Sequence, residues 1–174
     1  MYEKEIIVPE GVSIEIEGRK IKVSGPKGSL EKEFKGFSEI RIEKSENKIR
    51  IFSESERRKI KAMVGTIEAH IKNMIKGVTK GFVYKLRVVY SHFPVNLKIE
   101  EDKILIQNFL GERVPRVAKR VKGVDIKVEG QDIIVSGINI EDVGLMASRL
   151  EQSTRIKGYD RRVFSDGIYI VSRE

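Results

Sequence analysis

The sequence lacks features that define several common classes of protein. It contains no cysteine, so it forms no disulfide, has no thiol nucleophile and offers no cysteine ligands for zinc. No apolar run approaches the length of a membrane-spanning helix, and the N-terminus lacks the apolar stretch of a signal peptide. We therefore predict a soluble, cytoplasmic protein with no membrane partner.

Catalytic motifs are also missing. The sequence contains no Ser-His-Asp order, no nucleophile elbow and no dinucleotide-binding loop. The segment Gly25-Pro26-Lys27-Gly28 lacks the glycine spacing and the terminal Lys-Ser/Thr of a phosphate-binding P-loop. A tight turn is favoured there, with Lys27 free to touch phosphate.

The titratable residues that remain give no catalytic or metal-binding arrangement. His70 and His92 are the only histidines, and neither has other ligands at a metal-binding spacing. Asp160 and Asp166 could form a carboxylate pair in an RNA-processing enzyme, but the neighbouring arginines favour ion pairs that shape the tail. We predict that the chain is not an enzyme and has no catalytic residues, metal or cofactor.

Positive charge is in excess and is unevenly distributed. The chain has 34 Lys and Arg against 26 Asp and Glu, and this excess favours a polyanionic partner because cationic side chains displace counterions from phosphates. The basic residues gather in three runs, Lys72 to Lys98, Arg113 to Lys122 and Arg155 to Arg162. One such run alone is typical of a solvated face, but three together favour a surface that meets phosphates.

Hydrophobic periodicity predicts two helices among many short strands. Apolar residues recur at helical spacing behind a predicted capping box at residues 53–56, which indicates a helix over residues 55–76 that ends near Gly77. A second helix is predicted to start at Asn139, its N-cap. Alternating apolar and charged residues predict strands at 13–17, 20–24, 30–34, 40–43 and 48–51, and at 82–90, 97–100, 103–106, 117–121, 124–128 and 132–136.

The two halves of the chain repeat the same order of elements. A shift of roughly 83 residues aligns Ile21 with Ile104 and Ile67 with Leu150, with matching apolar phase. We therefore predict an α+β fold with an internal duplication, in which two small domains each pack an antiparallel sheet against one helix. The first domain covers residues 1–81, and the second covers residues 82–174 with a basic C-terminal tail.

The tail and the turns of the second domain carry candidate contacts for a nucleic acid. Tyr159, between Gly158 and a charged triplet, is the better candidate for stacking on an unpaired base, whereas Phe164 is expected in the core. The turn at residues 108–113 is equivalent to the glycine turn at residues 25–28, so it is also expected to face the partner.

Several motifs resemble a known family. These are the segments 7–12, 23–28, 73–87, 89–94, 108–112 and 160–169, which read IVPEGV, VSGPKG, NMIKGVTKGFVYKLR, VYSHFP, NFLGE and DRRVFSDGIY. In this order they resemble large ribosomal subunit protein six in its archaeal and eukaryotic form, and the likeness spans essentially the whole chain.

The resemblance implies a structural, rRNA-binding constituent of the large ribosomal subunit, located in the cytoplasm. It implies binding to large-subunit rRNA near the sarcin–ricin loop and the base of the factor-binding stalk, beside neighbouring ribosomal proteins and near translation factors. The second domain and tail would make most RNA contacts, and the first domain would project toward the stalk base. The alternative is a free-standing RNA-binding module.

Twelve residues are candidate rRNA contacts. The resemblance carries over His92, Arg113, Arg116, Lys157, Gly158, Tyr159, Arg161 and Arg162. The basic runs and the glycine turn add Gly111, Arg120, Lys122 and Arg155. Lys and Arg are expected to neutralise phosphates, while Gly111 and Gly158 permit a close approach of the backbone.

Overall fold

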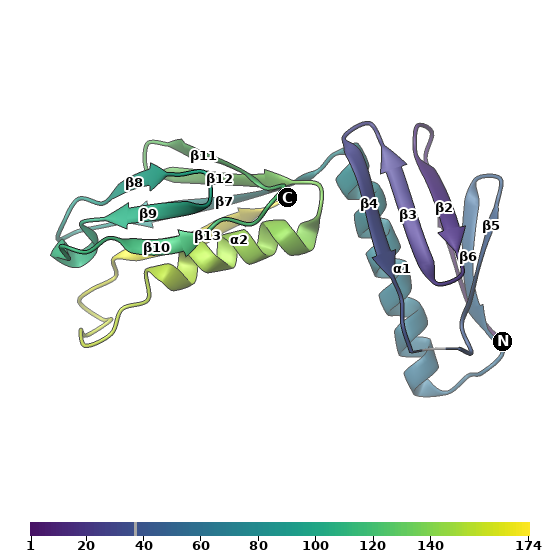
Figure 1. The fold of residues 1–174 in the computed structure, drawn as a ribbon. Coiled ribbons are helices and arrows are strands. Elements are labelled where there is room, and N and C mark those ends of the chain that lie inside the picture. The colour runs from purple at the N-terminus through teal and green to yellow at the C-terminus, as the bar shows by residue number, and fades with distance from the viewer. Residues whose placement is uncertain (37) are drawn as a thin grey trace. The chain divides into compact units, whose positions relative to one another are not determined.

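The computed structural model describes residues 1–36 and 38–174 and divides into two compact units, Met1–Gly81 and Phe82–Glu174 (Figure 1). Each unit contains two antiparallel sheets and one long helix. The predicted α+β fold with an internal duplication is confirmed.

Within residues 1–36 and 38–81, the first unit has six strands and the helix α1 (Arg58–Thr79). One sheet has the order β1-β6-β5, with strands β1 (Tyr2–Ile7), β5 (Arg41–Ser45) and β6 (Lys48–Ser53). The other has the order β2-β3-β4, with strands β2 (Ser13–Glu17), β3 (Lys20–Gly25) and β4 (Gly28–Glu33). Alternate apolar residues of these strands and one face of α1 form a single core, which includes Ile21, Val23, Ile49, Ile51, Val64, Ile67 and Ile71.

The helix α1 begins and ends three residues later than predicted, and the predicted capping box is wrong. Arg57 is the N-cap and makes no capping hydrogen bond, because its guanidinium has no acceptor atom. The Ser53 hydroxyl accepts from the backbone N–H of Ser55 before the helix begins. At the other end, the N–H groups of Lys80 and Gly81 both donate to the Lys76 carbonyl. Gly81 has a φ of 77°, so this glycine ends the helix and Gly77 lies within it.

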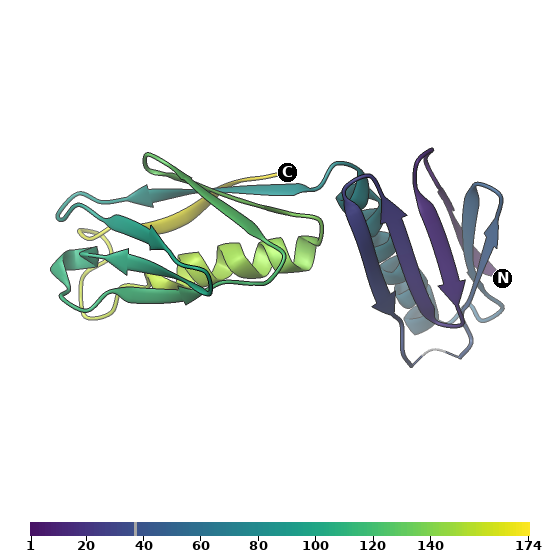
Figure 2. The ribbon, with the colours of Figure 1, turned by 45° about the horizontal axis from the view of Figure 1, so that its top comes forward.

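The second unit repeats this plan. The order β8-β9-β10 joins β8 (Asn96–Ile99), β9 (Lys103–Gln107) and β10 (Arg116–Lys119), and corresponds to β2-β3-β4. The order β11-β12-β7-β13 joins β11 (Asp125–Glu129), β12 (Asp132–Gly137), β7 (Phe82–Val89) and β13 (Gly167–Arg173). The helix α2 (Ile140–Ser153) runs along β7 and β13, as Figure 2 shows. Its predicted N-cap is confirmed, because the Asn139 side chain accepts from the Glu141 N–H at 3.0 Å.

Among the described residues of the first unit, no strand corresponds to β13. It pairs antiparallel with β7, which sets Ile168 opposite Val88 and Ile170 opposite Leu86. Ile168 is buried and packs with the core of the second unit. The tail therefore consists of a loop over residues 154–166, which precedes a strand that is part of the fold.

Candidate nucleic-acid interface

Three segments of the second unit meet at one end of its strands. These are the loop after β7 (residues 91–95), the turn between β9 and β10 with the first residue of β10 (108–116), and the tail loop (154–166); we call them together the loop surface. The Asn108 side chain donates to the Pro94 carbonyl at 2.9 Å, and the Phe93 ring lies against Gly111. The Ser91 N–H donates to the Asp166 carboxylate at 3.4 Å, which joins the tail to the first loop.

Most of the predicted contacts fall on the loop surface. They are His92, Gly111, Arg113, Arg116, Arg155, Lys157, Gly158, Tyr159, Arg161 and Arg162. Arg120 and Lys122 do not join them, because they follow β10 at the opposite end of the same strands (Figure 1). There the Arg120 guanidinium donates to the carbonyl of Glu100 at 3.1 Å. The structure therefore assigns Arg120 a contact that fixes two loops of the second unit.

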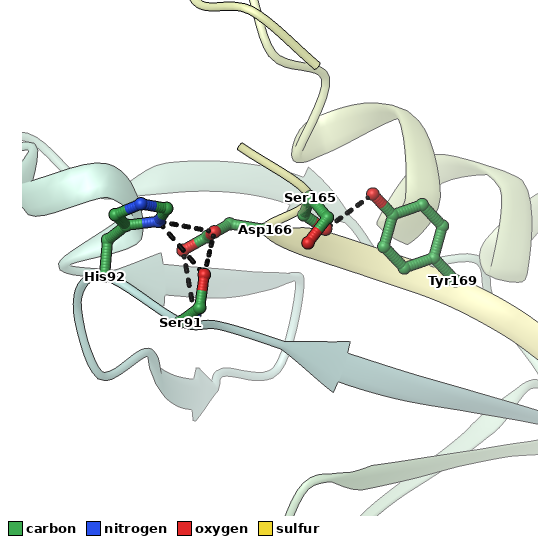
Figure 3. A network of polar contacts seen from close by, with 5 residues as sticks. All are labelled: Ser91, His92, Ser165, Asp166 and Tyr169. Carbon is green, nitrogen blue, oxygen red and sulfur yellow. Dashed lines mark hydrogen bonds and ion pairs between the residues drawn. The ribbon is translucent and has the colours of Figure 1, made fainter. Parts of the chain in front are cut away.

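Asp166 is the buried centre of the loop surface (Figure 3). It is 1% exposed, and its carboxylate accepts hydrogen bonds from the Ser91 hydroxyl at 3.2 Å and from His92 Nδ1 at 3.0 Å. Burial raises the pKa of this carboxyl, but the hydrogen bonds from His92 and Ser91 outweigh burial and hold the pKa below its usual value. The side chain therefore fastens the beginning of β13 to the loop after β7.

The expected ion pairs of the tail are found at one aspartate only. Asp160 pairs with Arg162 at 3.0 Å, and its hydrogen bonds with Arg162 lower the Asp160 pKa. Asp166 instead contacts His92, and within residues 1–36 and 38–174 it makes no ion pair with an arginine, which corrects the prediction for this residue. The Ser91 hydroxyl and the Asp166 carboxylate both contact the same nitrogen of His92, so the group lacks the relay of a Ser-His-Asp triad.

Three rings follow one another on the loop surface. The centroids of His92 and Phe164 lie 4.3 Å apart with an interplanar angle of 23°, and those of Phe164 and Tyr159 lie 4.7 Å apart at 51°. Phe164, expected in the core, is partly buried and packs against it. Tyr159 is 51% exposed. We call these three residues the aromatic row.

The cations of the loop surface fall into two groups. Arg113, Arg155, Lys157 and Arg161 are exposed, and their side chains make no ion pair or hydrogen bond with residues 1–36 or 38–174. Arg116 is engaged within the fold: it donates to the Ser153 and Arg155 carbonyls at 3.1 and 2.7 Å and to both Glu112 carboxylate oxygens at 2.9 and 2.7 Å. The Arg116 hydrogen bonds lower the Glu112 pKa.

The turn at residues 25–28 is tight, as predicted, but its lysine is not free. Pro26 and Lys27 connect β3 directly to β4, and the Lys27 ammonium donates to the Lys80 carbonyl at 2.6 Å just after α1. The Lys27 N–H also donates to the Val78 carbonyl at 2.9 Å. This turn therefore caps the end of α1.

Comparison with known protein families shows that the sequence of both units matches a family of ribosomal proteins. The model of one family, ribosomal protein L6, matches residues 8–81 and 93–167, once in each unit. The chain belongs to the ribosomal protein L6 family. The predicted resemblance is confirmed, and because the members of this family are ribosomal proteins, the chain is not an enzyme.

Three curated relatives from archaea share the name large ribosomal subunit protein uL6. The protein of Ignicoccus hospitalis is 52% identical over 172 residues, which cover 96% of this chain and 92% of the relative. That of Sulfurisphaera tokodaii is 49% identical over 174 residues, which cover 100% and 93%. That of Methanothrix thermoacetophila is 46% identical over 170 residues, which cover 98% and 96%.

The described residues contain neither a metal-binding cluster nor a helix that could span a membrane. No group of His, Asp and Glu within residues 1–36 and 38–174 is arranged to hold a metal ion. Over the same residues, neither helix combines the length and the apolar composition needed to span a bilayer.

Proposed function

We propose that the chain is a structural constituent of the large ribosomal subunit and binds large-subunit rRNA through the loop surface. The observation that carries this proposal is a group of exposed cations at one end of one unit, which have no ion-pair or hydrogen-bond partner among the described residues: Arg113, Arg155, Lys157 and Arg161. Membership of a ribosomal protein family supports the same conclusion.

The binding is electrostatic and depends on shape. Lys and Arg side chains neutralise phosphates, and the release of counterions makes the affinity fall as salt rises. Gly158 has a φ of 80°, and a Cβ built on it meets no atom within 4 Å, so the backbone there is open to a close approach. Arg116 supports the loop surface from within, and Arg120 joins two loops at the opposite end of the same strands, so both contribute mainly to the fold.

The resemblance of the sequence motifs supports a finer placement. We propose that the bound rRNA lies near the sarcin–ricin loop and the base of the factor-binding stalk, in the cytoplasmic ribosome. The first unit then faces neighbouring ribosomal proteins at the stalk base, and translation factors bind nearby. The alternative, a free-standing RNA-binding module, requires that the native protein does not travel with the large subunit in high-salt gradients.

Reversal of two tail charges tests the proposal. The double variant Arg161→Glu, Arg162→Glu should bind large-subunit rRNA more weakly, and each lost phosphate contact should reduce the slope of log K against log salt by about 0.7–0.9. The matched control is Arg19→Glu, Lys22→Glu, which reverses two exposed charges in the first unit. Filter binding of the full chain over a range of salt gives the slopes. An unchanged slope in the tail variant means that the tail does not lie on phosphate.

A further inference from the structure

We infer that the aromatic row is a stacking site for one unpaired nucleotide base, which rests on Tyr159, with His92 and Asp166 as positioning residues. The inference rests on the proposed function and names the part of an RNA that this site selects. In this inference His92 does not touch the base; its ring supports Phe164, which in turn supports Tyr159.

The geometry of the row indicates which ring is the outer one. Phe164 lies between the other two rings, at 4.3 Å from His92 and 4.7 Å from Tyr159. Tyr159 is 51% exposed and is the more open end of the row, since the His92 side chain at the other end is 33% exposed and is held by Asp166. Base–aromatic stacking tolerates any base because every base has a π-face. A planar base can therefore stack on Tyr159 and extend the aromatic row.

The His92 end of the row is fixed by the fold. His92 Nδ1 is bonded to Asp166, which is buried and also holds the hydroxyl and N–H of Ser91 (Figure 3). Phe164 packs against the core of the second unit. A ring held in this way loses little further conformational entropy when a ligand stacks on it, which favours binding.

Hydrogen bonds to Asp160 hold the turn that carries Tyr159. The Asp160 carbonyl accepts from the N–H groups of Val163 and Phe164 at 3.0 and 2.8 Å, and the Asp160 carboxylate accepts from the Arg162 N–H at 3.0 Å. These bonds fix the short path from Tyr159 to Phe164. Tyr159 therefore lies next to a turn whose backbone is fixed by hydrogen bonds.

The charge near Tyr159 supports a nucleotide as the ligand. Lys157 and Arg161 lie two residues before and after Tyr159 and are exposed. Arg155 and Arg161 also line a pocket of about 560 Å³ whose wall includes Phe164. A ring flanked by cations suits a base with its phosphates, and a base inside a duplex cannot reach the ring because its faces are already stacked.

Two RNAs of equal charge test the inference with the full chain. One is a hairpin with an unpaired loop, and the other is a blunt duplex with the same number of phosphates. We expect the hairpin to bind about tenfold more tightly, the scale of one base–aromatic stack. The Tyr159 ring protons should move upfield with the hairpin only. The chain has five tyrosines, and loss of a signal in Tyr159→Phe assigns this ring.

Variants separate stacking from charge. Tyr159→Ala should bind both RNAs equally and keep its salt dependence, whereas Tyr159→Phe should keep the preference for the hairpin. Tyr90→Ala, an exposed tyrosine outside the row, is the matched control and should behave as the unchanged chain. His92→Ala should reduce the preference and the upfield shift, and His92→Phe should restore both because it returns a ring to the row.

The outcomes also distinguish this inference from the proposed function. If neither RNA binds, the proposed RNA binding itself fails. If both RNAs bind equally well and Tyr159→Ala changes nothing, RNA binding stands and the stacking site is refuted. If His92→Ala keeps the hairpin preference and the upfield shift, the positioning role of His92 is wrong; if His92→Phe does not restore them, the Nδ1–Asp166 hydrogen bond is needed as well as the ring.

Discussion

Removal of the Asp166 carboxylate should loosen the second unit alone. In Asp166→Ala, the N–H and hydroxyl of Ser91 and Nδ1 of His92 lose their shared acceptor. A hydrogen bond to a charged group contributes about 1.5–3 kcal/mol. Water reaches Ser91 and His92 and replaces part of this, so we expect a total loss of about 2–3 kcal/mol in the free energy of unfolding.

Native-state hydrogen exchange of the full chain measures this loss. A loss of 2–3 kcal/mol corresponds to exchange that is roughly 30- to 150-fold faster at the amides that pair β13 with β7. Amides of β3 in the first unit serve as an internal control in the same spectrum and should not change. Equal exchange at β13 in both proteins would show that Asp166 does not hold the tail.

The same carboxyl gives the prediction a pH dependence. The pKa of Asp166 is lower in the fold than its usual value of 3.8, so folding favours the ionised form. Its stabilisation is therefore fully present above the unfolded pKa and is lost as pH falls through the folded pKa. The difference in unfolding free energy between the unchanged chain and Asp166→Asn should shrink as pH falls below about 3.8.

Two further substitutions probe the loop surface. Arg116→Lys keeps the charge but cannot bind Glu112 and two carbonyls at once, so urea denaturation should show a loss of about 1–2 kcal/mol while the salt slope of rRNA binding stays the same; a changed slope with unchanged stability would indicate a phosphate contact instead. Gly158→Val places a β-branched residue at a φ of 80° in an exposed turn, so incorporation into the large subunit should fall more than the melting temperature does; equal melting and equal incorporation would exclude a close approach at this glycine.

Elements with strong local patterns were predictable from the sequence. The alternation in Ser13–Glu17 and Lys103–Gln107 gave strands within one residue of their bounds, and Asn139 marked the start of α2. The strands β1 and β13 were not predicted. In β1, Lys4 occupies a position where the alternation requires an apolar residue, and in β13 the signal at Ile168 and Ile170 was hidden by the basic, glycine-bearing loop before it.

The site was predictable as a group of residue types but not as an arrangement. The basic runs located the tail and the turn at residues 108–116. The sequence could not separate Arg116 from Arg113, because the partners of Arg116 include carbonyls more than 35 residues away, at Ser153 and Arg155. It also missed Asp166 as an anchor, because Ser91 lies 75 residues before it and only the pairing of β13 with β7 brings the two together.

The central claim, that the loop surface lies on rRNA, is tested most directly by cleavage from a tethered iron chelate. The chain has no cysteine, so a single introduced cysteine is a unique attachment point. Val163→Cys places it on the loop surface, and Glu101→Cys places it at the opposite end of the same unit; both side chains are exposed. In reconstituted large subunits, position 163 should cleave rRNA near the sarcin–ricin loop and position 101 should cleave it less. Strong cleavage from position 101 with none from position 163 would contradict the account.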